Sequence, residues 1–139
     1  AGPLQRIKPS MPLPDLAKHY AGADVIADAV LRDEIVVNEM QKRAFNLTQA
    51  RAVAESEADT PGAATSIFNY IEAEYVKEQL ELQNRIRGTQ AFGWEGDSFT
   101  SEEIGMCRLN LEAKSISIAG GSNEIQLNII AKRVLGLPD

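Results

Sequence analysis

The chain has 139 residues, a formal net charge of −6 and 44% hydrophobic residues. This composition is typical of one globular domain, and it excludes disorder throughout the chain and collagen-like sequence. Acidic residues outnumber basic ones by 20 to 14 and no basic patch is visible, so we expect no nucleic-acid partner. No apolar run approaches the roughly 18 residues that a membrane-spanning helix needs.

The chain contains one cysteine, Cys107, and one histidine, His19. A single cysteine forms no internal disulfide, so the chain suits a reducing compartment and we expect it to be cytoplasmic. The residues of a structural zinc site are missing, so no metal is expected. A Cys107–His19 pair has the residue types of a catalytic dyad. However, His19 lies in a proline-rich segment. This favours the interpretation of Cys107 as a small buried residue over a catalytic role.

Residues 1–22 hold four of the six prolines. Proline blocks the interior of a helix and biases the preceding residue towards extended backbone. We therefore interpret 1–22 as a linker or arm outside the core, and 23–139 as a helical bundle. Because residue 1 is alanine, the chain is interpreted as a processed product or a piece of a longer protein.

The segment from about Asp24 to Glu57 is predicted to be a long helix. Its apolar residues recur at steps of three and four, which marks one face of a helix. Asp33 and Arg51 fall on the same stripe, as boundary residues or as polar groups that face a partner. Leu31 and Ile35 form a second apolar strip. The main stripe comprises Ile26, Val30, Val37, Met40, Ala44, Leu47 and Ala54.

A second long helix is predicted from Thr60-Pro61, a typical helix start, to Arg87, with Gly88 closing it. Its acidic residues indicate a solvated face. Its secondary apolar positions are Val76 and Leu80. The predicted inner stripe comprises Ala64, Phe68, Ile71, Tyr75, Gln79, Leu82 and Ile86, and the acidic residues are Glu72, Glu74, Glu78 and Glu81.

Two shorter helices complete the predicted fold. After a glycine- and aromatic-rich loop at 88–99, Thr100-Ser101-Glu102-Glu103 matches the capping box that opens a helix. Gly120-Gly121 ends this third helix, and Ser122 is expected to cap a fourth, which closes near Gly136. The predicted loop anchors are Phe92, Trp94 and Phe99. The predicted apolar residues of the two helices are Ile104, Cys107, Leu111 and Ile118, then Ile125, Ile129, Ile130, Val134 and Leu137.

These elements predict an all-α fold, a four-helix up-and-down bundle. A 30-residue helix is about 45 Å long, whereas a compact globule of this size is about 37 Å across. The long helices would overhang a spherical monomer. We therefore expect an elongated bundle that self-associates through its secondary apolar positions, most simply as a homo-oligomer.

The local feature most suggestive of binding is the turn at residues 119–124, Ala-Gly-Gly-Ser-Asn-Glu. Two glycines let a backbone approach a ligand closely, and the N-terminus of the following helix favours an anion or phosphate. The alternative is a tight interhelical turn with Ser122 as its N-cap. The spacing matches neither a P-loop nor a dinucleotide-binding fingerprint, so it favours the turn.

The end of the chain, residues 115–139, resembles the carboxy-terminal signature of the acyl-CoA dehydrogenase family. The resemblance rests on Gly-Gly-Ser-Asn-Glu-Ile-Gln at 120–126, Asn-Ile-Ile-Ala at 128–131 and Arg-Val-Leu-Gly-Leu-Pro at 133–138. It extends more loosely over residues 24–139. Members of this family are flavoproteins that oxidise the Cα–Cβ bond of an acyl-CoA thioester, and this chain resembles their carboxy-terminal helical bundle.

The resemblance implies that the turn contacts FAD, with side chains of Ser122 and Glu124 near the cofactor and backbone from Gly121 and Asn123. It implies no catalytic residue in this chain, because Gly120 stands where many members carry the glutamate base. The resemblance further implies acyl-CoA as the substrate of the intact enzyme, with the remaining domains or a partner subunit completing the site. The isolated chain should be inactive and bind no FAD tightly. The alternative is a non-enzymatic helical module or a catalytically silent partner subunit.

Overall fold

The structure is a computed structural model that describes residues 11–23, 25–56, 63–119 and 121–138. Every regular element in these ranges is helical, which confirms the predicted all-α fold. The four predicted helices correspond to α2 (Ala29–Ser56), α3 (Ala63–Arg87), α4 (Ser101–Ala113) and α5 (Asn123–Ile129). The predicted start at Thr60-Pro61 and the glycine Gly120 lie outside the described residues.

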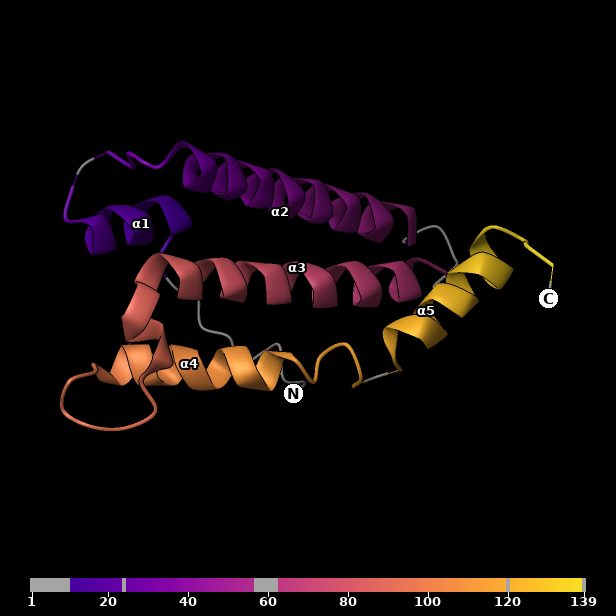
Figure 1. Ribbon diagram of the computed structural model, residues 1–139. Helices are drawn as coiled ribbons and strands as arrows, with labels where there is room; N and C mark the ends of the chain where they lie inside the picture. The colour runs from indigo at the N-terminus through magenta and orange to yellow at the C-terminus, as the bar shows by residue number, and fades with distance from the viewer. Residues whose placement is uncertain (1–10, 24, 57–62, 120, 139) are drawn as a thin grey trace.

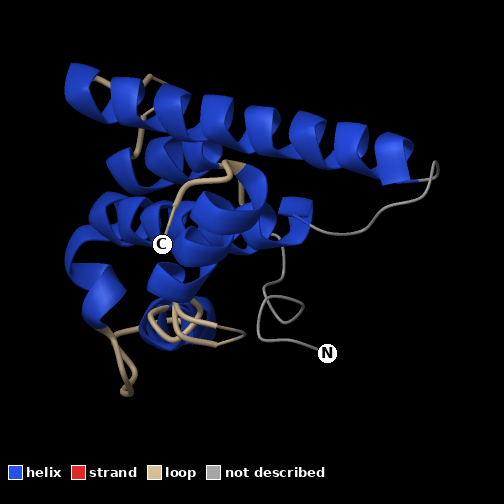
Figure 2. Ribbon diagram, turned by 90° about the vertical axis from the view of Figure 1, so that its right-hand side faces the viewer, coloured by secondary structure: helices blue, strands red, loops and turns tan. Residues whose placement is uncertain are grey.

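The helices stack in layers, with α3 in the middle. Figure 1 shows α2 along one side of α3 and α4 along the other, with successive helices running in opposite directions. Turned by 90°, the molecule still has α2 on its outer edge (Figure 2). Helix α5 packs against α3 and continues into a short π-helix, η3 (Ile130–Val134). Helix α3 is therefore the central element against which all other helices are placed.

A fifth helix, α1 (Leu13–Ala21), was missed by the sequence analysis. The prediction of an extended arm was wrong for these residues, because Pro12 is the N-cap and Pro14 lies in the first turn. Proline costs little there, since backbone N–H groups of the first turn have no intrahelical acceptor. Gly22 closes the helix with a φ of +62°.

Helix α1 is part of the core. Leu13, Leu16 and Ala17 lie on one face of it and are 1%, 1% and 3% exposed. Leu13 and Ala17 cluster with Ile35 of α2 and Leu82 of α3. Three helices that are distant in the sequence therefore share one small core, and α1 closes the end of the α2–α3 layer seen at the left of Figure 1.

Within α2, the main apolar stripe that the sequence predicted faces away from the core. Val30, Val37, Met40 and Leu47 are between 52% and 66% exposed. The strip treated as secondary is the inner one, since Ile35 is buried and Leu31 packs against the core cluster. In α3 the nominally secondary Leu80 is buried, as is Leu82 of the predicted inner stripe. Periodicity located the faces of these helices correctly but did not identify which face meets α3.

The start of α4 was predicted correctly, but its end was not. Thr100 Oγ1 accepts from the Glu103 backbone N–H at 3.2 Å, and Glu103 Oε2 accepts from the Thr100 N–H at 2.7 Å. These two bonds are the predicted capping box of α4. Helix α4 ends at Ala113, earlier than expected, and turns follow to residue 119. Ile118, which was predicted to lie on the apolar face of this helix, is therefore 71% exposed in these turns.

Candidate functional site

The turn before α5 contains a glycine that its own packing requires. Gly121 has a φ of +106°, a region that L-residues rarely adopt. A Cβ at this position would lie 2.8 Å from Nε2 of Gln126, a side chain that is only 6% exposed. The absence of a Cβ at Gly121 therefore leaves room for the buried Gln126 side chain, one turn into α5.

The first backbone N–H groups of α5 donate hydrogen bonds to acceptors within this chain. The Asn123 N–H donates to the Ser117 carbonyl at 3.1 Å, and the Ile125 N–H donates to Ser122 Oγ at 3.5 Å. Ser122 is thus the N-cap that the sequence predicted. With these donors engaged, the described turn matches the tight interhelical turn better than the phosphate-binding alternative.

Asn123 fastens the turn to α3. Its side-chain amide donates to Oε1 of Glu74, and Lys77 Nζ donates to the same oxygen at 2.6 Å. These contacts lower the pKa of the Glu74 carboxyl, with the Lys77 hydrogen bond as the main cause. Glu74 is one of the acidic residues predicted to form a solvated face, and its side chain is 37% exposed, but it also contacts another helix. Its partner Asn123 lies 49 positions away, so no local pattern could have shown this contact.

Glu124 is the side chain of the turn that points to solvent. It is exposed, and hydrogen bonds from the Ser122 hydroxyl and from its own backbone N–H lower the pKa of its carboxyl. The carboxylate is therefore ionised at neutral pH. An ionised carboxylate accepts hydrogen bonds from hydroxyl and N–H groups and repels phosphate.

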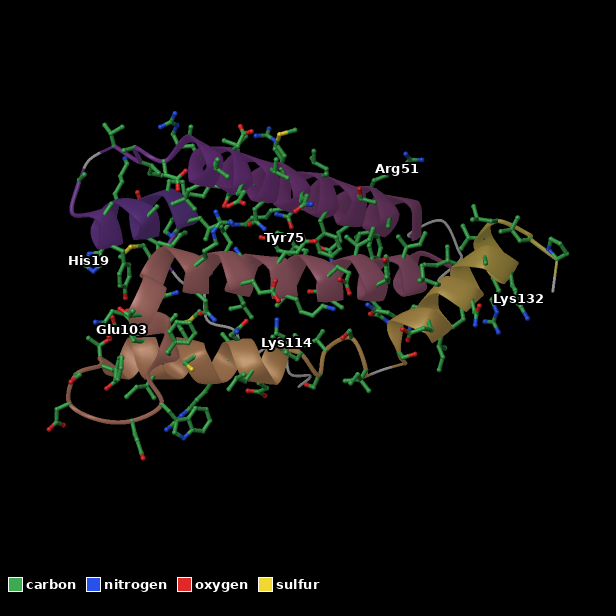
Figure 3. The ribbon with its side chains drawn as sticks, viewed as in Figure 1. His19, Arg51, Tyr75, Glu103, Lys114 and Lys132 are labelled. Atoms are coloured by element: carbon green, nitrogen blue, oxygen red, sulfur yellow. The ribbon has the colours of Figure 1, made fainter. Side chains whose placement is uncertain are left out.

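A buried arginine organises the other end of the bundle. The side chain of Arg87, at the end of α3, is 0% exposed and its Nη2 lies 3.5 Å from Glu102 Oε1. Its guanidinium also lies 5.8 Å from the centre of the Tyr20 ring. The Tyr20 hydroxyl donates to Glu103 Oε1 at 2.9 Å. These contacts join α1, α3 and α4 around one buried charge (Glu103 is labelled in Figure 3).

The loop after α3 begins with a 3-10 turn, η2 (Gly88–Phe92). The Trp94 ring lies 4.9 Å from the Arg108 guanidinium, and Arg108 also donates to the Trp94 carbonyl at 3.1 Å. Phe99 is half-buried and abuts Gly93, where a Cβ would meet its ring at 2.3 Å. Phe92, by contrast, is 80% exposed, so its prediction as an anchor was wrong.

A cavity of about 480 Å³ lies between α2 and α3, away from the turn. Met11, Phe45, Tyr75 and Met106 are among the residues that line it. Tyr75 projects from α3 into the space below α2 (Figure 3). Its hydroxyl is buried without a hydrogen-bond partner, and burial together with the nearby Glu39 charge raises its pKa to about 12. The hydroxyl is thus a neutral polar group in a poorly solvated cavity.

The described part of the chain does not favour a metal site or a catalytic role for Cys107. No group of three or more His, Cys, Asp or Glu side chains is arranged there to hold a metal ion. Cys107 is half-buried and His19 is exposed on α1. Among the helices that the structure describes, none is both long and apolar enough to cross a membrane.

Comparison with known proteins places this fold in a family. Residues 17–135 match the family model described as acyl-CoA dehydrogenase, C-terminal domain. The chain is 32% identical over 126 residues to acyl-CoA dehydrogenase IpdE1 of Mycolicibacterium smegmatis, and 32% identical to IpdE1 of Mycobacterium tuberculosis. Each match covers 91% of this chain, and 29% and 31% of the respective relatives. This chain therefore spans about a third of their length.

A solved structure agrees with this fold. The match is to a chain in the ChsE4-ChsE5 complex from Mycobacterium tuberculosis, with a TM-score of 0.71 and 20% identity. It covers 96% of this chain and 37% of that one. The all-helical architecture, the family match over most of the chain and the two relatives agree. The chain belongs to the acyl-CoA dehydrogenase family, in which it corresponds to the C-terminal helical domain.

Proposed function

We propose that this chain serves as the C-terminal domain of a flavin-dependent oxidoreductase that oxidises the Cα–Cβ bond of an acyl-CoA. In that role it contributes part of the FAD site and of the oligomer interface. The family match over residues 17–135 carries the proposal. We further propose a cytoplasmic setting, which suits the single cysteine.

The proposed cofactor contact is the turn at residues 121–124. Glu124 and Ser122 are its candidate side-chain contacts, since Glu124 is exposed and ionised and Ser122 adjoins it. A carboxylate suits the ribose hydroxyls or the adenine amino group of FAD and repels its phosphates. Gly121 and Asn123 shape the turn, through the fit of Gln126 under Gly121 and the tie from Asn123 to Glu74.

The chain's own residues limit what it does in catalysis. The chemistry that a bound FAD would supply is that of a hydride acceptor for the β-carbon of the substrate. The family's glutamate position before this turn is Gly120, which has no group to remove the α-proton. We therefore expect the proton acceptor to come from outside these 139 residues, and we expect the isolated chain to be inactive.

The test is Glu124→Gln in the assembled flavoprotein, with FAD affinity and melting temperature measured with and without FAD. We expect a weaker FAD affinity and a larger fall in melting temperature with FAD than without it. An equal fall in both states would make Glu124 a helix-capping residue and remove it from the cofactor site. Glu112→Gln, an exposed position on α4, is the matched control.

The isolated chain provides a second measurement. The proposal predicts no stoichiometric flavin absorbance after purification, because most of the dinucleotide would contact other domains. A yellow protein with one FAD per chain would contradict this division of the site.

A catalytically silent partner subunit is the alternative function, and Gly120 at the usual base position favours it. The solved relative is named as a complex of two proteins, which is compatible with that role. Assaying the assembled enzyme separates the two. If activity persists when every candidate base in the polypeptide that carries this chain is replaced, the silent-subunit function holds.

A further inference from the structure

The turn at residues 121–124 is held both by local contacts and by a contact with another helix. Locally, the Asn123 N–H donates to the Ser117 carbonyl at 3.1 Å. The Asn123 side-chain amide donates to Oε1 of Glu74 on α3, the helix against which α5 packs (Figure 1). The local bond shapes the turn, whereas the bond to Glu74 fixes where the turn lies relative to α3.

The Glu74 oxygen that Asn123 contacts has a second donor. Lys77, one turn further along α3, donates to the same oxygen at 2.6 Å. This bond is the main cause of the lowered pKa of Glu74, so the carboxylate is ionised at neutral pH. The bond from Asn123 is therefore charge-assisted, and such bonds are about twice as strong as bonds between neutral groups. The Lys77 and Glu74 side chains are 19% and 37% exposed, so water competes with them only in part.

Asn123 stands between the two side chains that are the candidate cofactor contacts. Ser122, the N-cap of α5, precedes it, and Glu124 follows it in the first turn of the helix. Peptide bonds are planar and stiff, so a shift of the Asn123 backbone also redirects both neighbours. A contact that fixes the Asn123 side chain therefore also fixes the directions of Ser122 and Glu124.

We propose that Glu74 is a positioning residue for the cofactor turn, which holds Asn123 from α3 and thereby directs the Ser122 and Glu124 side chains. The inference rests on the proposed function, because it takes the turn to contact FAD. Glu74 acts through Asn123, and Lys77 acts through Glu74 by keeping its carboxylate charged and in place. The residues that serve the cofactor thus include two on α3, a helix outside the sequence motif at 120–126.

A positioning role differs measurably from a purely structural one. A structural contact between α3 and α5 stabilises the folded chain equally with and without a ligand. Groups that contact a ligand must be held within about 0.5 Å of their productive geometry, so losing their support lowers ligand affinity as well. The two roles are therefore separated by comparing FAD affinity with the stability of the FAD-free protein.

The first experiment measures FAD affinity and melting temperature of Glu74→Gln in the assembled flavoprotein. We expect FAD to bind about fivefold more weakly, the effect of losing one hydrogen bond of average net strength. The melting temperature should fall more with FAD than without it. Glu78→Gln, an exposed position one turn along α3, is the matched control and should bind FAD like wild type. Both variants lose one negative charge, which by itself would favour the FAD phosphates. A weaker affinity in Glu74→Gln alone therefore reports the lost contact.

The second experiment exchanges the two partners in the FAD-free 139-residue chain. Glu74→Gln leaves two amides, Asn123→Asp leaves two carboxylates, and the double variant again pairs one amide with one carboxylate. Native-state hydrogen exchange of the backbone N–H groups of residues 123 and 126 reports how firmly the turn is held. Protection in the double variant should exceed the product of the two single effects by about fivefold. This coupling is the measure, because an aspartate at the start of α5 is favourable by itself.

The two experiments separate failure of this inference from failure of the proposed function. Independent effects of the two substitutions in the FAD-free chain would overturn the inference, because Glu74 would not hold Asn123. If Glu74→Gln leaves FAD affinity unchanged while Glu124→Gln lowers it, the inference fails and the proposed function stands. If neither variant changes FAD affinity, both fail. Circular dichroism checks the helix content of each variant, and Asn123→Ala removes the same bond from the other side if Glu74→Gln does not fold.

Discussion

The hydroxyl of Tyr20 in α1 donates a 2.9 Å hydrogen bond to Oε1 of Glu103 in α4, although 83 positions separate the two residues. The same Glu103 completes the capping box of α4 through Thr100. The Glu103 carboxylate therefore both caps the start of α4 and accepts a hydrogen bond from α1. Arg87 lies beneath this pair, with its guanidinium against the Tyr20 ring. The position of α1 is thus set by polar contacts as well as by its buried leucines.

Tyr20→Phe should destabilise the chain by about 1.5 to 3 kcal/mol, the usual contribution of a hydrogen bond to a charged acceptor. The ring and its contact with Arg87 remain, so the change isolates the hydroxyl. Urea denaturation followed by circular dichroism gives the free energy of unfolding. A variant as stable as wild type would show that this bond contributes nothing net.

Tyr75→Phe is the matched comparison and should behave in the opposite way. Its hydroxyl is buried in the cavity between α2 and α3 without a hydrogen-bond partner. Removing an unsatisfied buried polar group relieves a desolvation cost, so the variant should be as stable as wild type or more stable, by up to about 1 kcal/mol. A clear loss of stability would indicate a partner for this hydroxyl, such as a bound water.

Stability should fall in acid partly through Glu103. Hydrogen bonds from the Thr100 backbone N–H and the Tyr20 hydroxyl hold its pKa below the ordinary 4.5. Because the folded-state pKa is the lower one, its contribution to stability is complete above about pH 4.5 and is lost as the pH falls through the folded-state value. Unfolding free energies between about pH 7 and about pH 3 measure this loss.

Glu103→Gln should flatten that pH dependence. Glutamine can still serve the capping box but does not titrate, so the stability difference from wild type should shrink as the pH falls. Glu74 and Glu124 also have lowered pKa values, so part of the acid sensitivity should remain. Glu112→Gln, at an exposed position, should keep the wild-type profile. A constant difference between Glu103→Gln and wild type at every pH would contradict the assignment.

Gly121→Ala should cost more stability than Gly96→Ala. The two glycines have nearly equal φ angles of +106° and +108°, so both substitutions carry similar backbone strain of about 1 to 3 kcal/mol. Only at Gly121 would the new Cβ meet a neighbour, Nε2 of Gln126 at 2.8 Å, whereas nothing lies within 4 Å of the Cβ at Gly96. Thermal denaturation of both variants measures the difference. Equal losses would mean that Gln126 moves aside freely.

Asn123→Ala should loosen the turn from α3. It removes the amide that donates to Glu74, at a cost of about 1 kcal/mol. Asn128→Ala, at an exposed position of the same helix, should leave stability unchanged or raise it slightly, because alanine favours helix. Native-state hydrogen exchange of the first turn of α5 reports the local effect. Unchanged protection in Asn123→Ala would show that the Glu74 contact does not hold the turn.

Short-range signals in the sequence were enough to predict the helical class and most helix ends, because caps act over only three or four residues. Thr100 with Glu103, and Ser122 before α5, are such signals. The family resemblance also came from a local run, residues 115–139. The same local reading misjudged α1, because prolines that forbid a helix interior are tolerated in a first turn.

The packing of the helices was needed to establish which face of α2 is inner and what holds the turn before α5. Both faces of α2 carry apolar residues at helical spacing, and that spacing gives no information about which face another helix covers. Ile35 is buried because Leu82 and Leu13 meet it, while the richer stripe with Met40 and Leu47 remains exposed. Likewise, the packing of α5 on α3 joins Asn123 to Glu74, a contact that depends on the whole fold.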